Sequence, residues 1–233
     1  MPEAPERVEL SIDTASAMAG VAVSRQGVVL VELAWRTENN HSAELLPAID
    51  EVLDRAHSVR EDVAVLFADR GPGSYAGLRV GISTAMGLAL GLHADLLSAG
   101  RLELDAYPHA AFPGPIVAVH QAGRGELAWA VYEQREGLRE LQPPRLSSLE
   151  ELIELCPPSA LLCGELAGIE QRLRDELTGA RFATGVASQR RAGALAELGW
   201  HRYAGGERDN PVAVEPIYLR EPAITQPKAG RRL

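Results

Sequence analysis

An α/β fold made of two successive units is predicted by three features of the chain. Its 233 residues can bury the core of one large or two smaller domains, and its apolar fraction of 46% is that of a folded protein. Short apolar runs of strand length alternate with segments of helical periodicity. A break rich in proline and glycine at residues 107–115 separates two halves with similar elements. We therefore predict an α/β unit over residues 1–105 and another over residues 106–233, which ends in an irregular tail.

The first unit is expected to open with a meander of three strands. Val8, Leu10 and Ile12 alternate with polar residues, which is the pattern of a strand that runs into a polar turn. In the helix that follows the meander, Ser42 is placed to act as a cap, and Pro47 should lie in the first turn or kink the helix. The expected strands are residues 8–12, 19–24, 28–35, 63–68 and 94–99, and the expected helices are residues 45–56 and 74–92.

The second unit is expected to contain the same kinds of element. Its expected strands are residues 116–121, 127–134 and 160–163, and its expected helices are residues 148–155, 165–177 and 188–203. Residues 205–233 have the irregular pattern of a tail.

Charge and composition limit the function classes. The net charge of -9 and the pI near 5.2 oppose direct binding of nucleic acid, because an acidic surface repels phosphate. The basic end, with Lys228, Arg231 and Arg232, fits a solvated tail. Cys156 and Cys163 match neither a CxxC redox motif nor a zinc finger, so two free thiols are expected. The start lacks a signal-peptide pattern and no apolar run reaches bilayer length, so we expect a cytoplasmic protein that does not bind a membrane.

A glycine-rich segment, Gly71-Pro72-Gly73-Ser74-Tyr75-Ala76-Gly77, lies between an expected strand and an expected helix. Backbone N–H groups at such a helix start can bind phosphate. The segment lacks the Lys-Ser/Thr ending of a P-loop, and its third glycine is one residue late for a dinucleotide motif. A tight turn between strand and helix is therefore the favoured interpretation.

The helix after this turn carries a stripe of small residues. Gly77, Gly81, Ala85 and Ala89 recur every four residues and so share one face. Such a stripe lets a neighbouring helix approach closely, and each interior glycine costs about 1 kcal/mol relative to alanine, which packing must offset. From periodicity alone, packing inside the same domain and contact with a partner are equally supported.

No self-sufficient catalytic or metal site is visible in the sequence. Asp13-Thr14 ends the first expected strand, where a nucleotide-binding fold could place a carboxylate for a hydrated magnesium ion, but a local turn is favoured. The six histidines include no HxxxH or HxxH pair, so no zinc site is expected on one helix. His41 is expected to cap or to lie at the surface.

Four segments match, in order, the motifs of one known family. They are Ser11-Ile12-Asp13-Thr14-Ala15-Ser16, His41-Ser42 with Leu45-Leu46-Pro47, Gly71-Pro72-Gly73-Ser74-Tyr75-Ala76-Gly77-Leu78-Arg79-Val80-Gly81, and Pro216-Ile217-Tyr218-Leu219-Arg220. They resemble the TsaB (YeaZ) family of tRNA threonylcarbamoyladenosine biosynthesis. This resemblance implies the actin and Hsp70-like ATPase fold (ASKHA, ribonuclease H-like), with two lobes that each have a mixed sheet flanked by helices.

The resemblance also implies a noncatalytic scaffold that pairs with the related subunit TsaD, which transfers threonylcarbamoyl to adenosine 37 of tRNAs reading codons that begin with A. TsaE joins the pair, a homodimer forms when the chain is alone, and tRNA is reached only through the complex. ATP or ADP and metal would belong to the partner subunits, with Asp13 and Thr14 as a degenerate nucleotide site. The residues expected at the partner or dimer interface are His41, Leu45, Ile49, Gly73, Ser74, Tyr75, Gly77, Leu78, Gly81, Ile82 and Ala85.

Two segments depart from the related proteins. Where TsaD carries metal-binding histidines, this chain has Gly100-Arg101-Leu102-Glu103-Leu104-Asp105, so the metal chemistry is expected to be missing. The Asp-Ala-Arg usual in TsaB is replaced by His120-Gln121-Ala122-Gly123-Arg124. The alternatives to a partner subunit are a nucleotide-binding phosphotransferase, a metallopeptidase-like enzyme, and a purely structural homodimer.

Overall fold

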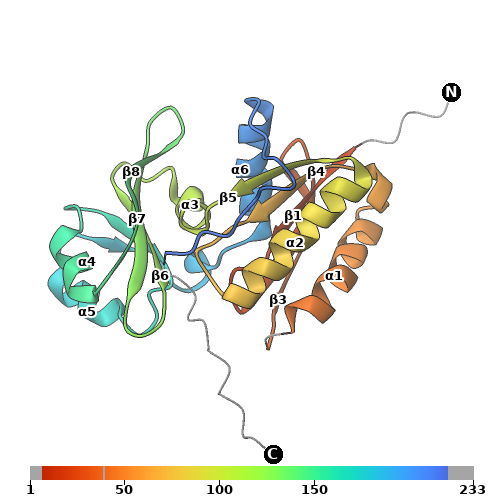
Figure 1. The fold of residues 1–233 in the computed structure, drawn as a ribbon. Helices are drawn as coiled ribbons and strands as arrows, with labels where there is room; N and C mark the ends of the chain where they lie inside the picture. Colours follow the sequence, from red (N-terminus) through yellow and green to blue (C-terminus); the bar gives the residue numbers. More distant parts are fainter. Residues whose placement is uncertain (1–6, 39, 220–233) are drawn as a thin grey trace, which may run out of the picture.

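The computed structural model describes residues 7–38 and 40–219 and contains two lobes (Figure 1). Each lobe is built on a five-stranded mixed sheet flanked by helices, as the sequence predicts (Figure 1). The carboxyl ends of the parallel strands in the two sheets lie toward the junction between the lobes, and this arrangement positions the site described below.

The first sheet has the strand order β3-β2-β1-β4-β5. Its strands are β1 (Val8–Asp13), β2 (Met18–Arg25), β3 (Val28–Arg36), β4 (Val63–Asp69) and β5 (Asp95–Ala99). The first three are antiparallel neighbours, and β4 and β5 add parallel to β1. Every residue of β1 is buried, because helices cover both faces of the sheet. The predicted meander is confirmed.

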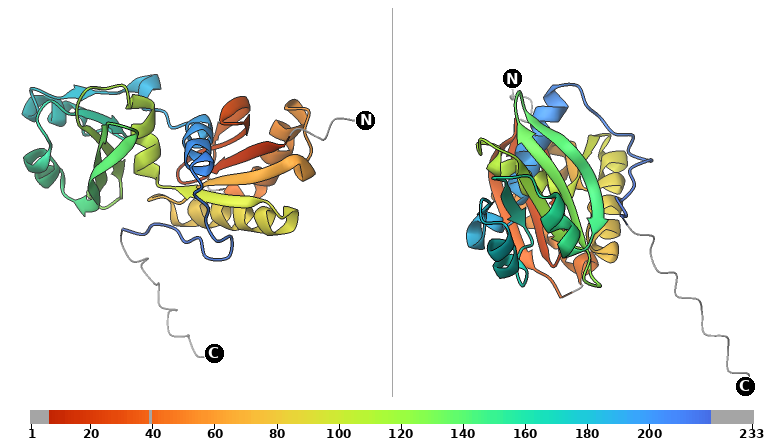
Figure 2. Two further views of the ribbon diagram at one scale, coloured as in Figure 1. Left: turned by 90° about the horizontal axis from the view of Figure 1, so that it is seen from above. Right: turned by 90° about the vertical axis from the view of Figure 1, so that its left-hand side faces the viewer.

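Helices α1 (His41–Arg55) and α2 (Tyr75–Leu92) cover one face of this sheet, and α6 (Ala192–Ala204) covers the other (Figure 2, left). Helix α6 packs so closely that a Cβ on Gly199 would lie 2.5 Å from the Phe67 ring. The first lobe is therefore discontinuous in sequence, which the predicted division into residues 1–105 and 106–233 did not anticipate.

The start of α1 differs from the prediction. The helix begins at His41, and Asn40 occupies the cap position without a side-chain hydrogen bond. Ser42 lies inside the first turn, so its predicted capping role is wrong. Pro47 is exposed in the second turn.

The second sheet has the strand order β10-β9-β6-β7-β8. Its strands are β6 (Ile116–Gln121), β7 (Leu127–Gln134), β8 (Leu138–Ser147), β9 (Leu161–Gly164) and β10 (Arg181–Phe182). The sequence analysis missed β8, whose Pro143 and Pro144 argue against a strand. An edge strand tolerates proline, because one side of its backbone needs no ladder partner.

The remaining helices of the second half are short. They are α3 (Arg101–Ala106), α4 (Leu149–Leu155), α5 (Glu170–Glu176) and the 3-10 turns η2 (Tyr107–His109) and η3 (Gly185–Ser188). A further 3-10 turn, η1 (Arg60–Asp62), precedes β4 in the first lobe. Helix α5 is shorter than predicted, and α3 was not predicted. Helix α3 follows β5 of the first lobe but packs on β6, β7 and β9 of the second. It therefore lies between the lobes (Figure 1).

The segment after α6 is irregular, as predicted, and returns along the first lobe. The backbone N–H and the hydroxyl of Ser98 each donate a 2.6 Å hydrogen bond to Asp209. The Ile217 N–H donates to the Arg70 carbonyl at 2.7 Å, and Tyr218 stacks on Tyr75 of α2 with ring centroids 5.3 Å apart. The last motif residue, Arg220, and the basic end of the chain lie outside the described residues.

The small-residue stripe of α2 faces the sheet. A Cβ on Gly77 would lie 2.1 Å from the Thr14 carbonyl oxygen, and one on Gly81 would lie 2.2 Å from Thr14 Oγ1. Ala85 and Ala89 are buried on the same side. The stripe therefore serves packing within the lobe, which periodicity alone had left open.

Among the described residues, α2 is the one helix whose length and composition could cross a membrane, with 18 residues and a mean hydropathy of 1.2. This qualifies the prediction that no apolar run reaches bilayer length. One such helix is weak support for a membrane span, because a core helix meets the same criteria. Here α2 packs on β1, β4 and β5.

Two glycines of α2 provide a matched test of this packing. We expect Gly81→Ala to lower the free energy of unfolding by about 2 kcal/mol, because the added methyl collides with Thr14. Gly87→Ala should raise it by about 1 kcal/mol, because no atom lies within 4 Å of its Cβ position and alanine favours the helix. Urea unfolding followed by circular dichroism measures both, and equal effects would contradict the assigned helix orientation.

Candidate functional site

Two carboxylates meet at the carboxyl end of the first sheet. β1 and β4 are parallel neighbours with Ile12 paired to Ala68, so the next residues, Asp13 and Asp69, lie side by side. Their side chains are 5% and 0% exposed. Two like charges this close and this buried require compensation.

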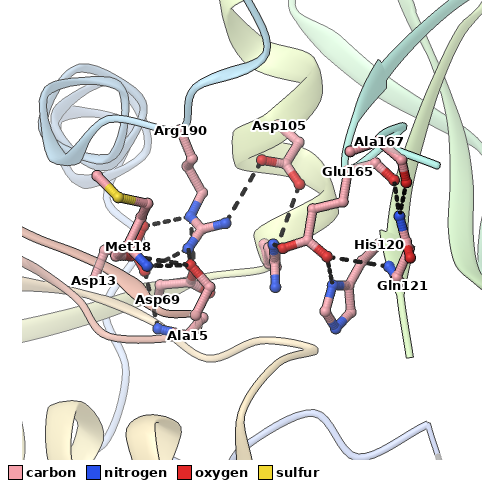
Figure 3. A network of polar contacts seen from close by, with 12 residues as sticks. Asp13, Ala15, Met18, Asp69, Asp105, His120, Gln121, Glu165, Ala167 and Arg190 are labelled. Carbon is pink, nitrogen blue, oxygen red and sulfur yellow. Dashed lines mark hydrogen bonds and ion pairs between the residues drawn. The ribbon is translucent and has the colours of Figure 1, made fainter. Parts of the chain in front are cut away.

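Arg190 supplies that compensation from the connection between η3 and α6 (Figure 3). Its Nε donates to Asp13 Oδ2, and its Nη2 donates to Asp13 Oδ1 at 3.0 Å and to Ser16 Oγ at 3.1 Å. The same guanidinium lies 3.5 Å from Asp69 Oδ2 and 3.8 Å from Asp105 Oδ1. One buried cation thus faces three carboxyl groups.

The polar contacts continue into the second lobe. Arg101 at the start of α3 has its Nε 3.6 Å from Asp105 Oδ2, and its Nη2 donates to Glu165 Oε1. The other oxygen of Glu165 lies 2.8 Å from His120 Nδ1 (Figure 3). Glu165 follows β9 and His120 lies near the end of β6, so the carboxyl ends of both sheets share one interlobe charge network.

This network changes the pKa values of its members in opposite directions. Burial alone would raise the pKa of Asp13, but the charge and hydrogen bonds of Arg190 outweigh it, so the pKa is lowered. Burial and the neighbouring charge of Asp13 raise the pKa of Asp69 well above its usual value. Burial also raises the pKa of Asp105, against the opposing charges of Arg190 and Arg101. Arg190 therefore offsets the burial of Asp13 more than it offsets the burial of Asp69 and Asp105.

His120 and Gln121 occupy a divergent segment, and both face Glu165. The pKa of His120 is lowered, chiefly by burial, so the ring is neutral near pH 7. The Gln121 side-chain amide donates to the Ala167 carbonyl at 2.6 Å, and its backbone N–H donates to Glu165 at 3.2 Å. In this chain the segment therefore holds the Glu165 turn in place.

The glycine-rich turn is not an open phosphate loop. The Gly71 N–H donates to Asp69 Oδ1, the Ser74 N–H to the Ala15 carbonyl, and the Gly77 N–H to Ser74 Oγ. These donors are thus used within the protein. A Cβ on Gly73 would lie 2.2 Å from the Ala15 carbonyl oxygen, so this glycine allows close backbone approach. The interpretation as a tight turn is confirmed.

Thr14 bonds to the end of the glycine-rich turn, and His41 bonds to the segment that follows β1. Thr14 Oγ1 donates to the Gly77 carbonyl at 2.8 Å, which ties β1 to α2. His41 Nε2 lies 3.0 Å from the Ser16 carbonyl oxygen, and the residue is 5% exposed. The Thr14 hydroxyl thus binds α2.

The predicted interface residues divide into two groups. Tyr75 is exposed, and Gly73 and Ser74 are half-buried. Eight others are buried inside the lobe, which corrects their assignment to direct partner contact: His41, Leu45, Ile49, Gly77, Leu78, Gly81, Ile82 and Ala85. The sheet and the second helix cover them, because each helix turns its most apolar stripe inward.

The outward face of α1 and α2 was missed by the sequence analysis. Leu46 on α1 is 44% exposed and Leu90 on α2 is 52% exposed. Ser83, Gly87 and Gly91 lie on the same outward side of α2, and both glycines have open space at the Cβ position. A signal was present in the sequence, because Gly87 and Gly91 disfavour a helix interior and fall outside the stripe of Gly77, Gly81, Ala85 and Ala89.

Known proteins provide the identity of the chain. The tRNA threonylcarbamoyladenosine biosynthesis protein TsaB of Bacillus subtilis is 28% identical over 217 residues, covering 91% of this chain and 93% of that protein. TsaB of Haemophilus influenzae is 30% identical over 239 residues, covering 95% of this chain and 97% of that protein. The chain belongs to the TsaB family.

Solved structures and one family model agree with this fold. YeaZ from Pseudomonas aeruginosa superposes with a TM-score of 0.74 at 22% identity, covering 90% of this chain and all of that one. A ROK family protein from Streptococcus pneumoniae gives a TM-score of 0.51 at 12% identity, covering 86% of this chain and all of that one. Residues 29–184 match the family model for TsaD, tRNA N6-adenosine threonylcarbamoyltransferase. This TsaB-family chain therefore has the actin and Hsp70-like ATPase fold and carries a TsaD-like domain.

A nucleotide with its metal ion, which this fold implies, does not fit the residues present. The Arg190 guanidinium lies against the carboxylate of Asp13 that would hold a hydrated cation. Within residues 7–38 and 40–219, no group of three or more His, Cys, Asp or Glu side chains has the arrangement of a metal site. The cavity beside Arg190 measures about 300 Å³ and is lined by both Arg101 and Arg190.

Replacing Asp13 or Asp69 by the neutral asparagine should change the stability of the protein in different ways. We expect Asp13→Asn to lower the free energy of unfolding at pH 7 by about 3 kcal/mol, because it breaks a buried pair. The lowered pKa of Asp13 gives stability that is present above its unfolded pKa and lost as pH falls through the folded pKa. The difference in unfolding free energy between wild type and Asp13→Asn should therefore shrink in acid.

For Asp69, the dependence of stability on pH has the opposite sign. Its raised pKa gives stability that is present below the unfolded pKa and lost as pH rises through the folded pKa. Asp69→Asn should thus leave the protein at least as stable as wild type at pH 7, with a difference that grows as pH rises from the unfolded pKa of Asp69 toward its raised folded pKa. Urea titrations across this range measure both variants, and a large loss for Asp69→Asn at pH 7 would contradict the assignment.

Proposed function

We propose that this chain is a noncatalytic partner subunit that pairs with a TsaD homologue, with TsaE, during threonylcarbamoyl transfer to adenosine 37 of tRNA. Membership in the TsaB family supports a role in making threonylcarbamoyladenosine. The observation that carries the noncatalytic part is Arg190, whose guanidinium fills the place where this fold would use a carboxylate and a metal ion. Nucleotide and metal would then belong to the partners.

The outward face of α1 and α2 supports the pairing. Leu46 and Leu90 leave apolar surface exposed, and Gly87 and Gly91 allow a helix of another subunit to approach closely. The match to the TsaD model supports a partner of related shape that could present its own helices to this face. In the absence of TsaD, a second copy of the chain would use the same face.

The net charge of -9 supports indirect contact with tRNA. An acidic chain gains no counterion release from a phosphate backbone, so tRNA would be held by other subunits. The expected place of action is the cytoplasm.

Reconstitution tests the proposal. Purified TsaD and TsaE should transfer threonylcarbamoyl to tRNA faster with this chain than without it, and the chain alone should transfer nothing. Equal rates with and without the chain would overturn the role as a partner.

The enzyme alternatives require ligand binding by the isolated chain. A phosphotransferase would bind ATP with magnesium, and a metallopeptidase-like enzyme would bind zinc. Isothermal calorimetry with ATP and with zinc separates these activities from a partner role, because binding of either ligand at micromolar concentration would favour an enzyme.

The outward face can be tested with matched leucine variants. We expect Leu90→Glu to weaken copurification with TsaD at least 10-fold, because it places a charge in an apolar contact, while the melting temperature stays near wild type. Leu141→Glu is the control, since Leu141 is 43% exposed on β8 of the other lobe. Size-exclusion chromatography with light scattering measures pairing, and equal loss for both variants would contradict the assignment.

A further inference from the structure

The exposed side of α2 carries an arginine that two tyrosines hold in place. The Arg79 guanidinium lies over the Tyr75 ring, 4.2 Å from its centroid. Arg79 Nε donates a 3.3 Å hydrogen bond to the Tyr218 hydroxyl. The aromatic face attracts the cation, and the hydrogen bond fixes the direction of the guanidinium. The Arg79 side chain is therefore ordered although it is exposed to solvent.

Tyr218 reaches Arg79 because the chain after α6 returns along the first lobe and passes α2 (Figure 1). Val214 of this returning segment packs against a small cluster that includes Leu78 and Ile82 of α2. The contact between Arg79 and Tyr218 joins residues 139 positions apart in the sequence. The orientation of Arg79 thus depends on how the returning segment packs on α2.

The guanidinium has no acidic partner in the part of the chain that the structure describes. No carboxylate of residues 7–38 or 40–219 forms an ion pair with Arg79, although Glu215 lines the same cavity. This cavity measures about 340 Å³, and its lining includes the apolar side chains of Ile82, Met86 and Val214. Arginine binds carboxylates through its fork of N–H donors. Arg79 therefore has donors for a carboxylate of another molecule, and the cavity has room for the side chain that carries it.

Arg79 lies on the same side of α2 as Leu90, on the outward face described above. The two residues are 11 positions apart, which is about three turns of helix and about 16 Å along its axis. Tyrosine and arginine are enriched among the residues that contribute most to binding at protein interfaces. A partner helix that runs along α2 would meet Leu90 at one end and the Arg79 cluster at the other.

We propose that Arg79, held between Tyr75 and Tyr218, binds a carboxylate on a helix of the partner subunit. The facing helix would carry an aspartate or glutamate at the level of Arg79 and apolar side chains toward Leu90. Because the guanidinium is already ordered, less conformational entropy is lost on binding. The returning segment is then part of the partner site, with Tyr218 as a positioning residue. This inference rests on the proposed pairing with TsaD.

The key variant is Arg79→Met, which keeps a similar length and removes the charge. We expect its Kd for purified TsaD to rise about 30-fold, with a melting temperature near wild type because the side chain is exposed. Raising NaCl from about 0.05 M to about 0.5 M should weaken binding of wild type more than binding of Arg79→Met, because salt screens the ion pair. Arg79→Lys should recover only part of the affinity, since an ammonium lacks the planar fork. Isothermal calorimetry measures each Kd.

Tyr218→Phe tests the positioning role. It removes the hydrogen bond to Arg79 and keeps the ring, so the Kd should rise about 3-fold while the salt dependence stays that of wild type. Combined with Arg79→Met, it should cause no further loss. A full additional loss in the double variant would show that Tyr218 acts without Arg79, and would overturn its positioning role.

Arg174→Met is the matched control. Arg174 also lies over an aromatic ring, 4.4 Å from the centroid of Phe182, and its side chain is 43% exposed in the other lobe. It should bind TsaD like wild type. An equal loss for Arg174→Met and Arg79→Met would overturn the proposal, because the effect would then be one of general charge.

The remaining outcomes separate this inference from the proposed function. If wild type binds TsaD and Arg79→Met binds it equally well, the carboxylate contact is overturned and the pairing stands. If wild type does not bind TsaD, both fail. A tRNA phosphate is the other anionic group to test, and binding of tRNA by the isolated wild type that Arg79→Met loses would also overturn the proposal.

Discussion

Compensation of buried charge at the junction of two sheets is the interaction on which this structure depends. Asp13 and Asp69 end adjacent parallel strands, and both are almost completely buried. An uncompensated buried charge costs an amount comparable to the net stability of a domain. Arg190 reaches them only after the chain has built the second lobe and turned back to α6. Folding of the first lobe is thereby tied to the position of the second.

Close approach of α2 to β1 is the second constraint, and it explains why one helix has two glycine faces. Inward glycines let the helix backbone meet Thr14, whose hydroxyl then bonds the Gly77 carbonyl. Outward glycines have no such reason within the chain, and they lie beside exposed Leu90. A helix that is glycine-rich on both sides is suited to being packed by its own sheet on one side and by another subunit on the other.

The junction between the two sheets lies at an edge where α/β folds commonly bind ligands. This fold brings the carboxyl ends of strands from two lobes together, and in open α/β sheets ligands bind outside such ends. In this TsaB-family chain, Arg101 of α3 and Arg190 of the connection before α6 lie at that junction. Internal ion pairs therefore link the two lobes at this junction.

The sequence by itself determined the first lobe's strands, most of the second sheet and the family, because these depend on local periodicity and on contiguous motifs. It placed Asp13 at a strand end and favoured a tight turn over a phosphate loop for the glycine-rich segment. Only the tertiary structure decided that α6 returns to the first sheet, that the stripe from Gly77 to Ala89 faces inward, and that Arg190 meets Asp13 from 177 residues away. Helical periodicity identifies a face but not what covers it, and the pairing of distant charges depends on how the two lobes are assembled.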